Sequence, residues 1–253
     1  MIEESVRRRR IPIGTGLRLH VTEWGAADGW PVVILHGGAH DASHWAEVCR
    51  RLPPSLRCIV PDQRGHGASD RAADGDYSCA AQTDDLVALL EALRVERCAL
   101  VGHSMGGLNA LRFAGTWPAR VRALVLVDVG TETRKAGLEA IRRSREAAAR
   151  APAPDPAAPP PPFDLRLLDF VPSYGGDATE RRKLLAASRA PLLIMRGAKS
   201  KILSADHAEE SARRGKGRVA TIPDAGHNVS QHNPMAVAAE LRGFFEPLLR
   251  EGG

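Results

Sequence analysis

Short apolar runs alternate with segments of helical periodicity along most of the chain. Six such runs lie at residues 32–35, 58–60, 98–101, 123–127, 192–195 and 218–222. Strands that are apolar at nearly every position are buried on both faces, which is typical of a parallel sheet. Helical patterns at residues 83–93 and 234–249 lie between or after these runs, and Thr83-Asp84-Asp85 is the expected start of the first. This alternation predicts an α/β protein.

The chain begins with a different pattern, which predicts an antiparallel hairpin. Residues 9–13 and 17–23 flank Gly14-Thr15-Gly16, a turn-forming sequence. The basic run at residues 7–10 is interpreted as the solvated face of an edge strand, because charge at an edge prevents further strand pairing.

The interval from about residue 130 to residue 190 breaks the alternation. It holds a basic stretch with helical spacing at residues 135–150, followed by residues 151–162, which are almost all Ala, Pro or Asp. Such a composition predicts an extended linker rather than regular structure. We therefore expect a core domain of residues 1–130 and 190–253, with residues 131–189 inserted as a cap or lid over the carboxyl edge of the sheet.

The most informative motif is Gly102-His103-Ser104-Met105-Gly106-Gly107, which follows an apolar run and precedes a helix-like stretch. This is the layout of a strand, a sharp turn and a helix with a serine at the tip. Gly102 and Gly106 flank the serine because such a turn leaves no room for a Cβ atom. The motif predicts that Ser104 is a nucleophile; the alternative is a glycine-rich turn that packs a helix on a sheet.

A serine hydroxyl needs a base to take its proton. Of the nine histidines, His227 fits best because it follows a predicted strand late in the chain. His232 is the second choice, and His103 is expected to point elsewhere. The developing oxyanion needs preorganised donors, and the backbone N–H groups of Gly38 and Met105 are the candidates.

Composition narrows the class of protein. The chain has 253 residues, 43% of them hydrophobic and 26% charged, which suits one large soluble α/β domain. The net charge of +5 comes from scattered arginines and only 4% of residues are aromatic, so nucleic-acid binding is disfavoured. No apolar segment approaches the ~18 residues that span a bilayer. The first residues do not resemble a signal peptide, and the four cysteines lack metal-ligand spacing. We expect a cytoplasmic protein with no metal or cofactor, no membrane partner and a small-molecule substrate.

Four motifs in their order and spacing resemble the α/β-hydrolase superfamily, in particular its small cofactor-independent branch of esterases, lactonases and C–C bond hydrolases. They are Leu35-His36-Gly37-Gly38, Asp62-Gln63-Arg64-Gly65-His66-Gly67-Ala68-Ser69, the serine turn, and Gly226-His227. The resemblance implies an eight-stranded, mostly parallel sheet flanked by helices, with an inserted helical cap. The second motif, with His66, is interpreted as a structural loop beside the site.

One departure concerns the third, acidic residue of the catalytic triad. The resemblance places it in the loop at residues 196–204, where Lys199 and Lys201 occupy the expected positions. A lysine beside the base would disfavour the imidazolium that must form. Asp128, which directly follows the run at residues 123–127, is the best alternative, although an aspartate there can also serve only to hold the entry to the cap. Asp206 is a weaker candidate that more simply caps a helix.

The leading hypothesis is a serine hydrolase that cleaves a small-molecule carboxylic ester, thioester or lactone through an acyl-enzyme on Ser104. The alternatives are a C–C bond hydrolase of a diketone-like substrate, a two-residue Ser–His site, and a ligand-binding protein without turnover because Lys201 stands in the acid loop. Trp45 and His40 are candidates to line the pocket, although Trp45 could equally be a core residue. Cations of the cap could attract an acidic substrate, although a solvated helix face is the simpler explanation; they are Arg134, Lys135, Arg142, Arg143 and Arg145.

Overall fold

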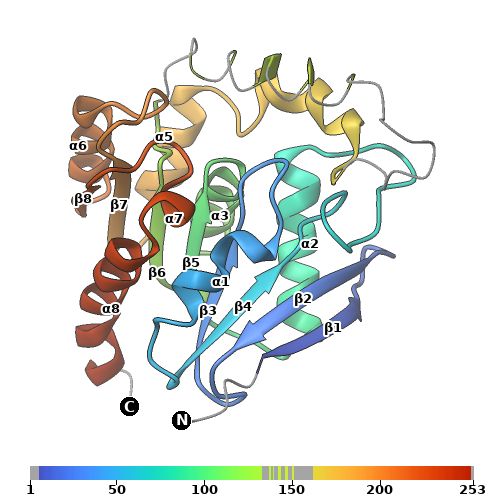
Figure 1. The fold of residues 1–253 in the computed structure, drawn as a ribbon, viewed down its shortest axis with the longest axis horizontal. Helices are drawn as coiled ribbons and strands as arrows, with labels where there is room; N and C mark the ends of the chain where they lie inside the picture. Colours follow the sequence, from blue (N-terminus) through green and yellow to red (C-terminus); the bar gives the residue numbers. More distant parts are fainter. Residues whose placement is uncertain are drawn as a thin grey trace.

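The computed structural model describes residues 6–132 and 162–251, and between them residues 137, 139, 142, 143, 146, 147 and 150. The strands are β1 (Arg7–Pro12), β2 (Arg18–Trp24), β3 (Trp30–Leu35), β4 (Leu56–Pro61), β5 (Cys98–His103), β6 (Val121–Val127), β7 (Leu192–Gly197) and β8 (Arg218–Ile222). They form one eight-stranded sheet in the order β1-β2-β4-β3-β5-β6-β7-β8 (Figure 1). Only the β1–β2 and β2–β4 pairs are antiparallel. The predicted fold class is therefore confirmed.

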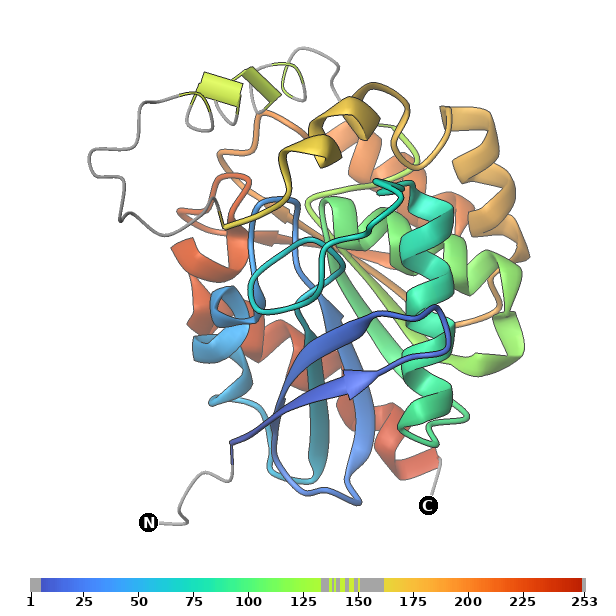
Figure 2. The same ribbon diagram turned by 90° about the vertical axis from the view of Figure 1, so that its right-hand side faces the viewer.

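Helices cover both faces of the sheet. The longer ones are α2 (Cys79–Ala92), α3 (Met105–Thr116), α5 (Ala178–Ala187), α6 (Ala205–Arg214) and α8 (Pro234–Glu251), and shorter ones are η1 (Ala42–Trp45), α1 (Ala46–Cys49), η2 (Pro118–Arg120), η3 (Leu165–Ser173) and α7 (Val229–His232). Residues of α2, α3 and α6 share one hydrophobic cluster with the sheet, and residues of α1 and α8 share the other (Figures 1 and 2).

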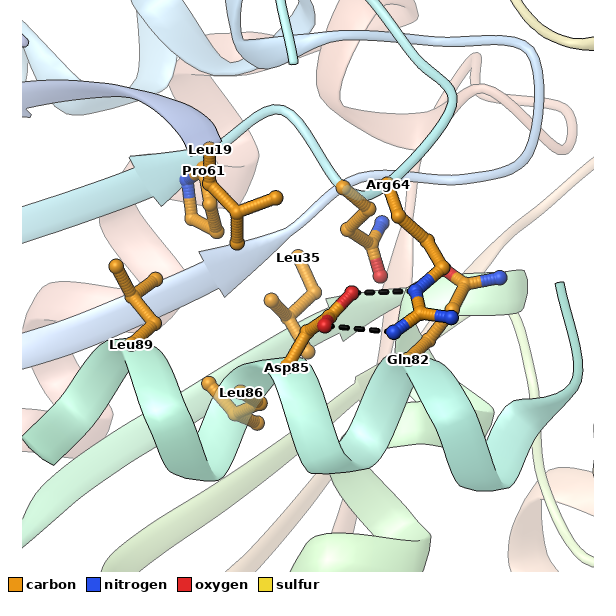
Figure 3. Close-up of a pocket in the computed structure, with 9 residues that line it drawn as sticks. Leu19, Leu35, Pro61, Arg64, Gln82, Asp85, Leu86 and Leu89 are labelled. Carbon is orange, nitrogen blue, oxygen red and sulfur yellow. Dashed lines mark hydrogen bonds and ion pairs between the residues drawn. The ribbon is translucent and has the colours of Figure 1, made fainter. Parts of the chain in front are cut away.

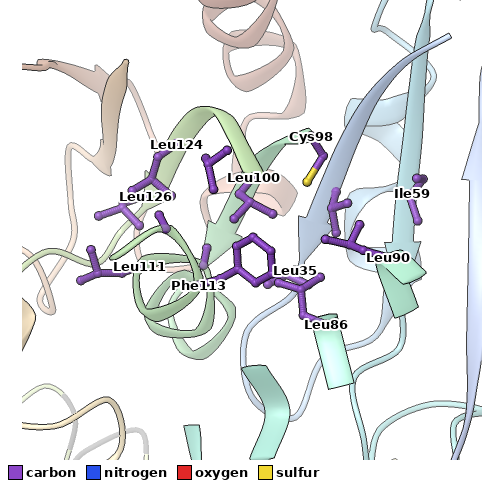
Figure 4. Packing of buried hydrophobic residues seen from close by; sticks show 14 of the residues in the cluster. Leu35, Ile59, Leu86, Leu90, Cys98, Leu100, Leu111, Phe113, Leu124 and Leu126 are labelled. Atoms are coloured by element: carbon purple, nitrogen blue, oxygen red, sulfur yellow. The ribbon is translucent and has the colours of Figure 1, made fainter. Parts of the chain in front are cut away.

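This two-sided cover explains why the parallel strands are apolar at nearly every position. In β6, Leu124 and Leu126 belong to the same cluster as Phe113 of α3 (Figure 4), whereas Val125 and Val127 face the cluster that contains α8. All five side chains are fully buried. Burying one such side chain contributes about 1.5–3 kcal/mol, so both clusters hold the strand ends in place.

The predicted hairpin is formed by β1 and β2, and β1 lies at the edge of the sheet. Its basic run is not only a solvent-exposed edge, because one of its arginines also pairs with a buried acidic residue. Glu23 is 1% exposed and pairs with Arg9 of β1 and with Arg57 of β4. Burial opposes ionisation of Glu23, but hydrogen bonds from Arg57 and Arg9 hold the pKa of its carboxyl below the usual range. Part of the predicted solvated face therefore neutralises a buried carboxylate.

One predicted helix start and one predicted helix cap are wrong. Helix α2 begins at Cys79 rather than at Thr83, and the Ser78 side chain caps it by accepting a backbone N–H of the first turn. Helix α6 is capped in the same way by Ser204, whereas Asp206 lies inside the first turn. In both cases a serine just before the helix supplies the acceptor that free N–H groups require.

The predicted linker at residues 151–162 lies outside the described residues except for Pro162, and so does most of the basic stretch at residues 135–150. The segment that follows (gold in Figure 2) packs on the loop after β4: Phe163 bridges to His66, and Tyr77 donates a hydrogen bond of 2.7 Å to Asp164. Across the part of the chain that the structure describes, no helix is both long and apolar enough to cross a membrane.

Candidate active site

The site is built around the sharp turn between β5 and α3. Ser104 has a φ of 51°, a left-handed conformation that costs a non-glycine residue of order 1–3 kcal/mol and persists only where packing enforces it. Packing here is tight enough: a Cβ atom on Gly102 would lie 2.4 Å from the carbonyl oxygen of Gly106, and one on Gly106 would lie 2.5 Å from that of His36. The prediction that both positions lack room for a Cβ atom is therefore confirmed.

Three side chains from three strand ends form one hydrogen-bond chain. The Oγ atom of Ser104, after β5, lies 3.0 Å from Nε2 of His227, after β8. Nδ1 of the same ring lies 2.7 Å from Oδ2 of Asp128, which directly follows β6. A carboxylate only accepts, so Nδ1 carries the proton and Nε2 is left to accept from the serine hydroxyl. This is the arrangement in which an imidazole can take a proton from the serine.

Asp128 is 0% exposed, so its charge needs partners. Besides His227 it has two other donors: the Gly197 N–H at 3.1 Å and the Ser200 hydroxyl at 2.6 Å. Ser200 in turn accepts from the backbone of residues 202 and 203, which fixes its position. Sequence reasoning missed Ser200, because a serine between two lysines gives no sign of a distant carboxylate.

The two lysines of that loop do not face the base. Lys199 is exposed, and its Nζ atom lies 2.8 Å from Oδ1 of Asp224, whose pKa the ion pair lowers. Lys201 is also exposed. The expected conflict between a lysine and the imidazolium is therefore not seen for Lys199, because its ammonium group pairs with Asp224.

The two candidate oxyanion donors come from two different segments of the chain. Gly38 is buried in the loop after β3, and Met105, 7% exposed, is the first residue of α3. Neither backbone N–H donates to another residue of the described chain. Buried N–H groups are rarely left without an acceptor, so these two N–H groups suit the predicted role of donors to a ligand oxygen.

The loop that carries Gly38 is held by a neutral histidine. His36 is fully buried, and burial lowers its pKa to about 4. Its Nδ1 atom donates to the Gly37 carbonyl at 2.8 Å, and its Nε2 atom accepts the Gln63 N–H at 2.9 Å. The Gln63 side-chain oxygen accepts a hydrogen bond of 2.7 Å from Nδ2 of Asn109 in α3. The loop after β3 is thereby tied to the helix that carries Met105.

The other residues that the sequence suggested lie elsewhere. His232 is exposed and accepts a hydrogen bond from the Gly226 N–H, so it is not aimed at Ser104. Trp45 is fully buried in the core and does not line a site. His40 is half-buried and stacks on His44 with ring centroids 4.0 Å apart.

The Asp62–Ser69 motif is structural, as the sequence indicated. The Asp62 carboxylate accepts the N–H groups of Ala42 and Ala68 and contacts His20. A small pocket between this loop and α2 is closed by a buried ion pair of Arg64 and Asp85 (Figure 3). The pair ties the loop to α2, and none of the three residues Ser104, His227 and Asp128 lines the pocket.

Comparison with known proteins gives matches over the whole fold. A family model of the alpha/beta hydrolase fold matches residues 31–170. The chain is 40% identical over 118 residues to 2-hydroxymuconate semialdehyde hydrolase of Pseudomonas sp. (strain CF600), which covers 46% of this chain and 41% of that protein. The match thus spans about two fifths of that curated relative.

Two solved structures extend over nearly the full chain. A thermophilic esterase from Thermogutta terrifontis is 25% identical with a TM-score of 0.74, covering 96% of this chain and 99% of that one. A putative lipase from Acinetobacter baumannii AYE has a TM-score of 0.85 at 21% identity, covering 97% and 93% respectively, and this likeness concerns the fold alone.

Proposed function

Because this chain belongs to the α/β-hydrolase fold family, we propose that it is a serine hydrolase that cleaves a small-molecule carboxylic ester, thioester or lactone. The observation that carries the proposal is the hydrogen-bond chain from Ser104 through His227 to Asp128, at 3.0 and 2.7 Å. A histidine of a solvated loop would not be expected to hydrogen-bond both to a serine in a strained conformation and to a fully buried carboxylate. The likeness to a solved esterase over 96% of the chain agrees with this chemistry.

In the proposed reaction the Ser104 oxygen bonds to the substrate carbonyl carbon while its proton passes to Nε2 of His227. The imidazolium that forms is stabilised by Asp128, whose carboxylate accepts the Nδ1–H. The carbonyl oxygen becomes an oxyanion and accepts the N–H groups of Gly38 and Met105. Loss of one such donor costs about 10²–10³ in turnover in a serine protease, so these two groups supply a large share of the rate.

The tetrahedral adduct then collapses to an acyl-enzyme. The bond from carbon to the leaving oxygen or sulfur breaks, and His227 returns its proton to that atom. A water molecule repeats the sequence: His227 takes its proton, its oxygen attacks the acyl carbon, and Ser104 leaves with the proton restored. The same two residues therefore serve both halves of the cycle.

Labelling with a fluorophosphonate probe tests the proposal. We expect the wild type to be labelled and the Ser104→Ala variant to be silent, with His227→Ala labelled at least about 10²-fold more slowly because the base is gone. Ser55→Ala is the matched control, since Ser55 is an exposed serine in the loop before β4. An unlabelled wild type, or labelling that survives Ser104→Ala, would contradict the proposal.

A C–C bond hydrolase is the second candidate, favoured by the 40% identity to 2-hydroxymuconate semialdehyde hydrolase over 118 residues. The two candidates differ in the electrophile and share the serine and the base. Turnover of p-nitrophenyl esters, thioesters and lactones should be compared with that of a ring-opened diketone such as a substituted 2-hydroxy-6-oxo-dienoate. Preference for the diketone by kcat/KM would replace the ester proposal with this candidate.

A further inference from the structure

His103 lies directly before the nucleophile and is 2% exposed, yet it takes no part in the proposed proton transfer. It is the last residue of β5. Its Nε2 atom lies 2.8 Å from the backbone carbonyl oxygen of His227. A carbonyl only accepts, so Nε2 carries the ring proton and donates it to the segment that holds the base.

The same ring also contacts the loop that carries Gly38. A Cβ atom on Gly37 would lie 2.6 Å from Nδ1 of His103 and 3.3 Å from Nδ1 of His40. The His103 and His40 rings are stacked, with centroids 5.6 Å apart and planes inclined by 6°. The imidazole of His103 thus occupies the space that a side chain at position 37 would need.

We propose that His103 is a positioning residue that sets the base and the oxyanion loop relative to Ser104. It meets each of the three parts differently: by the peptide bond to Ser104, by a hydrogen bond to the main chain of His227, and by van der Waals contact with Gly37. The proposal rests on the function proposed above, because it assigns the role relative to that serine and that base.

The hydrogen bond matters because its acceptor is the main chain of the base. The His227 side chain reaches Asp128 and Ser104 with its two nitrogens, which fixes the plane of the ring. The carbonyl bond from His103 fixes the backbone from which that ring projects. A displacement of about 1 Å in a reacting group can cost of order 10²-fold in rate, so a buried anchor at this point has a direct catalytic consequence.

Two substitutions that differ by one methylene group test the proposal. In His103→Gln the side-chain amide reaches the place of Nε2 and can still donate to the His227 carbonyl. In His103→Asn the amide is too short to do so. We expect kcat to fall by about 10–100-fold in the asparagine variant with KM changed little, and to stay within about threefold of wild type in the glutamine variant.

Hydrogen exchange of the peptide containing residues 223–229 supplies a readout that needs no activity. Exchange should be faster in His103→Asn and unchanged in His103→Gln, both compared at equal thermal stability. Equal exchange in the two variants and wild type, or equal loss of kcat in both variants, would overturn the proposal. If the exchange pattern holds while the wild type fails to label with the fluorophosphonate, the positioning role stands and the proposed function fails.

Discussion

Strands β6 and β7 are parallel neighbours, so the segments that follow them lie at the same edge of the sheet. One segment carries the carboxylate that contacts His227, and the other helps to hold it. The β6 loop supplies a carboxylate, Asp128, which is 0% exposed and adopts a φ of 52°. The β7 side supplies no acid, but Gly197 at the end of β7 and Ser200 in the loop after it donate to that carboxylate, while Lys199 pairs with Asp224. From this difference we expect that His227 needs a charge at its Nδ1 atom, and that a carboxylate from either strand end could supply it.

The largest effect on kcat is expected when the carboxylate that follows β6 is replaced by a neutral side chain. Asp128→Asn keeps the shape of the side chain, and asparagine tolerates the left-handed backbone at this position. An amide can donate to Nδ1 and so favours the wrong ring tautomer. We expect kcat for an ester to fall by about 10⁴-fold, as in a serine protease without its acid. Steady-state kinetics with circular dichroism as a folding check measures this.

Full activity in Asp128→Asn would mean that the loop after β6 only holds the fold together. The Asp128→Gly variant provides the control for space, because glycine accepts the positive φ and also removes the side chain. Both variants should be equally slow if charge, rather than bulk, is what His227 requires.

Transfer of the acid to the β7 loop is the next largest effect. The Ser200 hydroxyl lies 2.6 Å from the Asp128 carboxylate, so an aspartate at position 200 can reach the space that Asp128→Gly vacates. The double variant Asp128→Gly/Ser200→Asp should recover about 10–100-fold in kcat over Asp128→Gly alone. No recovery in a folded double variant would show that the strand of origin does matter.

Removing the β7 hydroxyl alone should have a moderate effect. Ser200→Ala leaves Asp128 charged but deletes one of its three donors. A hydrogen bond to a charged group contributes about 1.5–3 kcal/mol, and part of this appears as poorer alignment of His227. We expect kcat to fall by about tenfold, with restoration in Ser200→Thr. Unchanged kcat in Ser200→Ala would show that the hydroxyl of the loop after β7 does not contribute to catalysis.

The loop after β3 offers a contrast in charge, since its buried group, His36, is neutral. Burial lowers the pKa of His36 to about 4 from 6.5. Below pH 6.5 the unfolded chain therefore takes up a proton that the folded chain refuses until about pH 4. The free energy of unfolding should fall over this window by up to about 1.4 kcal/mol per pH unit from this residue.

Urea unfolding between pH 7 and pH 4 checks that slope. His36→Gln retains an acceptor for the Gln63 N–H but does not titrate. The free energy of unfolding of this variant should therefore fall less steeply as the pH is lowered, with a slope that corresponds to about one proton fewer taken up on unfolding. An identical slope in both proteins would show that His36 is not the group responsible.

The smallest effect is expected at the lysines. Lys199 is 69% exposed, and its ion pair with the 81% exposed Asp224 is screened by solvent. Lys199→Ala and Lys201→Ala should each leave kcat and KM within about twofold of wild type. A gain of tenfold or more in either variant would show that the ammonium group opposes the imidazolium after all.

What the sequence could predict follows from where each residue stands. Ser104 and Asp128 come directly after apolar strands, so the parallel sheet had to bring them to one edge. Ser200 could not be predicted, because its partner lies 72 residues away and depends on the register of β6 with β7. The start of α2 was misjudged because its first turns bury polar side chains, Gln82 and Thr83, which hide the helical pattern.

The crowding around the serine turn has a consequence for how such a protein can diverge. Any side chain at positions 102 or 106 would have to displace main-chain atoms less than 3 Å away, so single substitutions there have almost no neutral outcome. The acid reaches its place through a side chain, and the Ser200 hydroxyl 2.6 Å away reaches the same place from the neighbouring strand. If the double variant regains activity, the carboxylate can move between strands as such proteins diverge, whereas the backbone under the nucleophile cannot change.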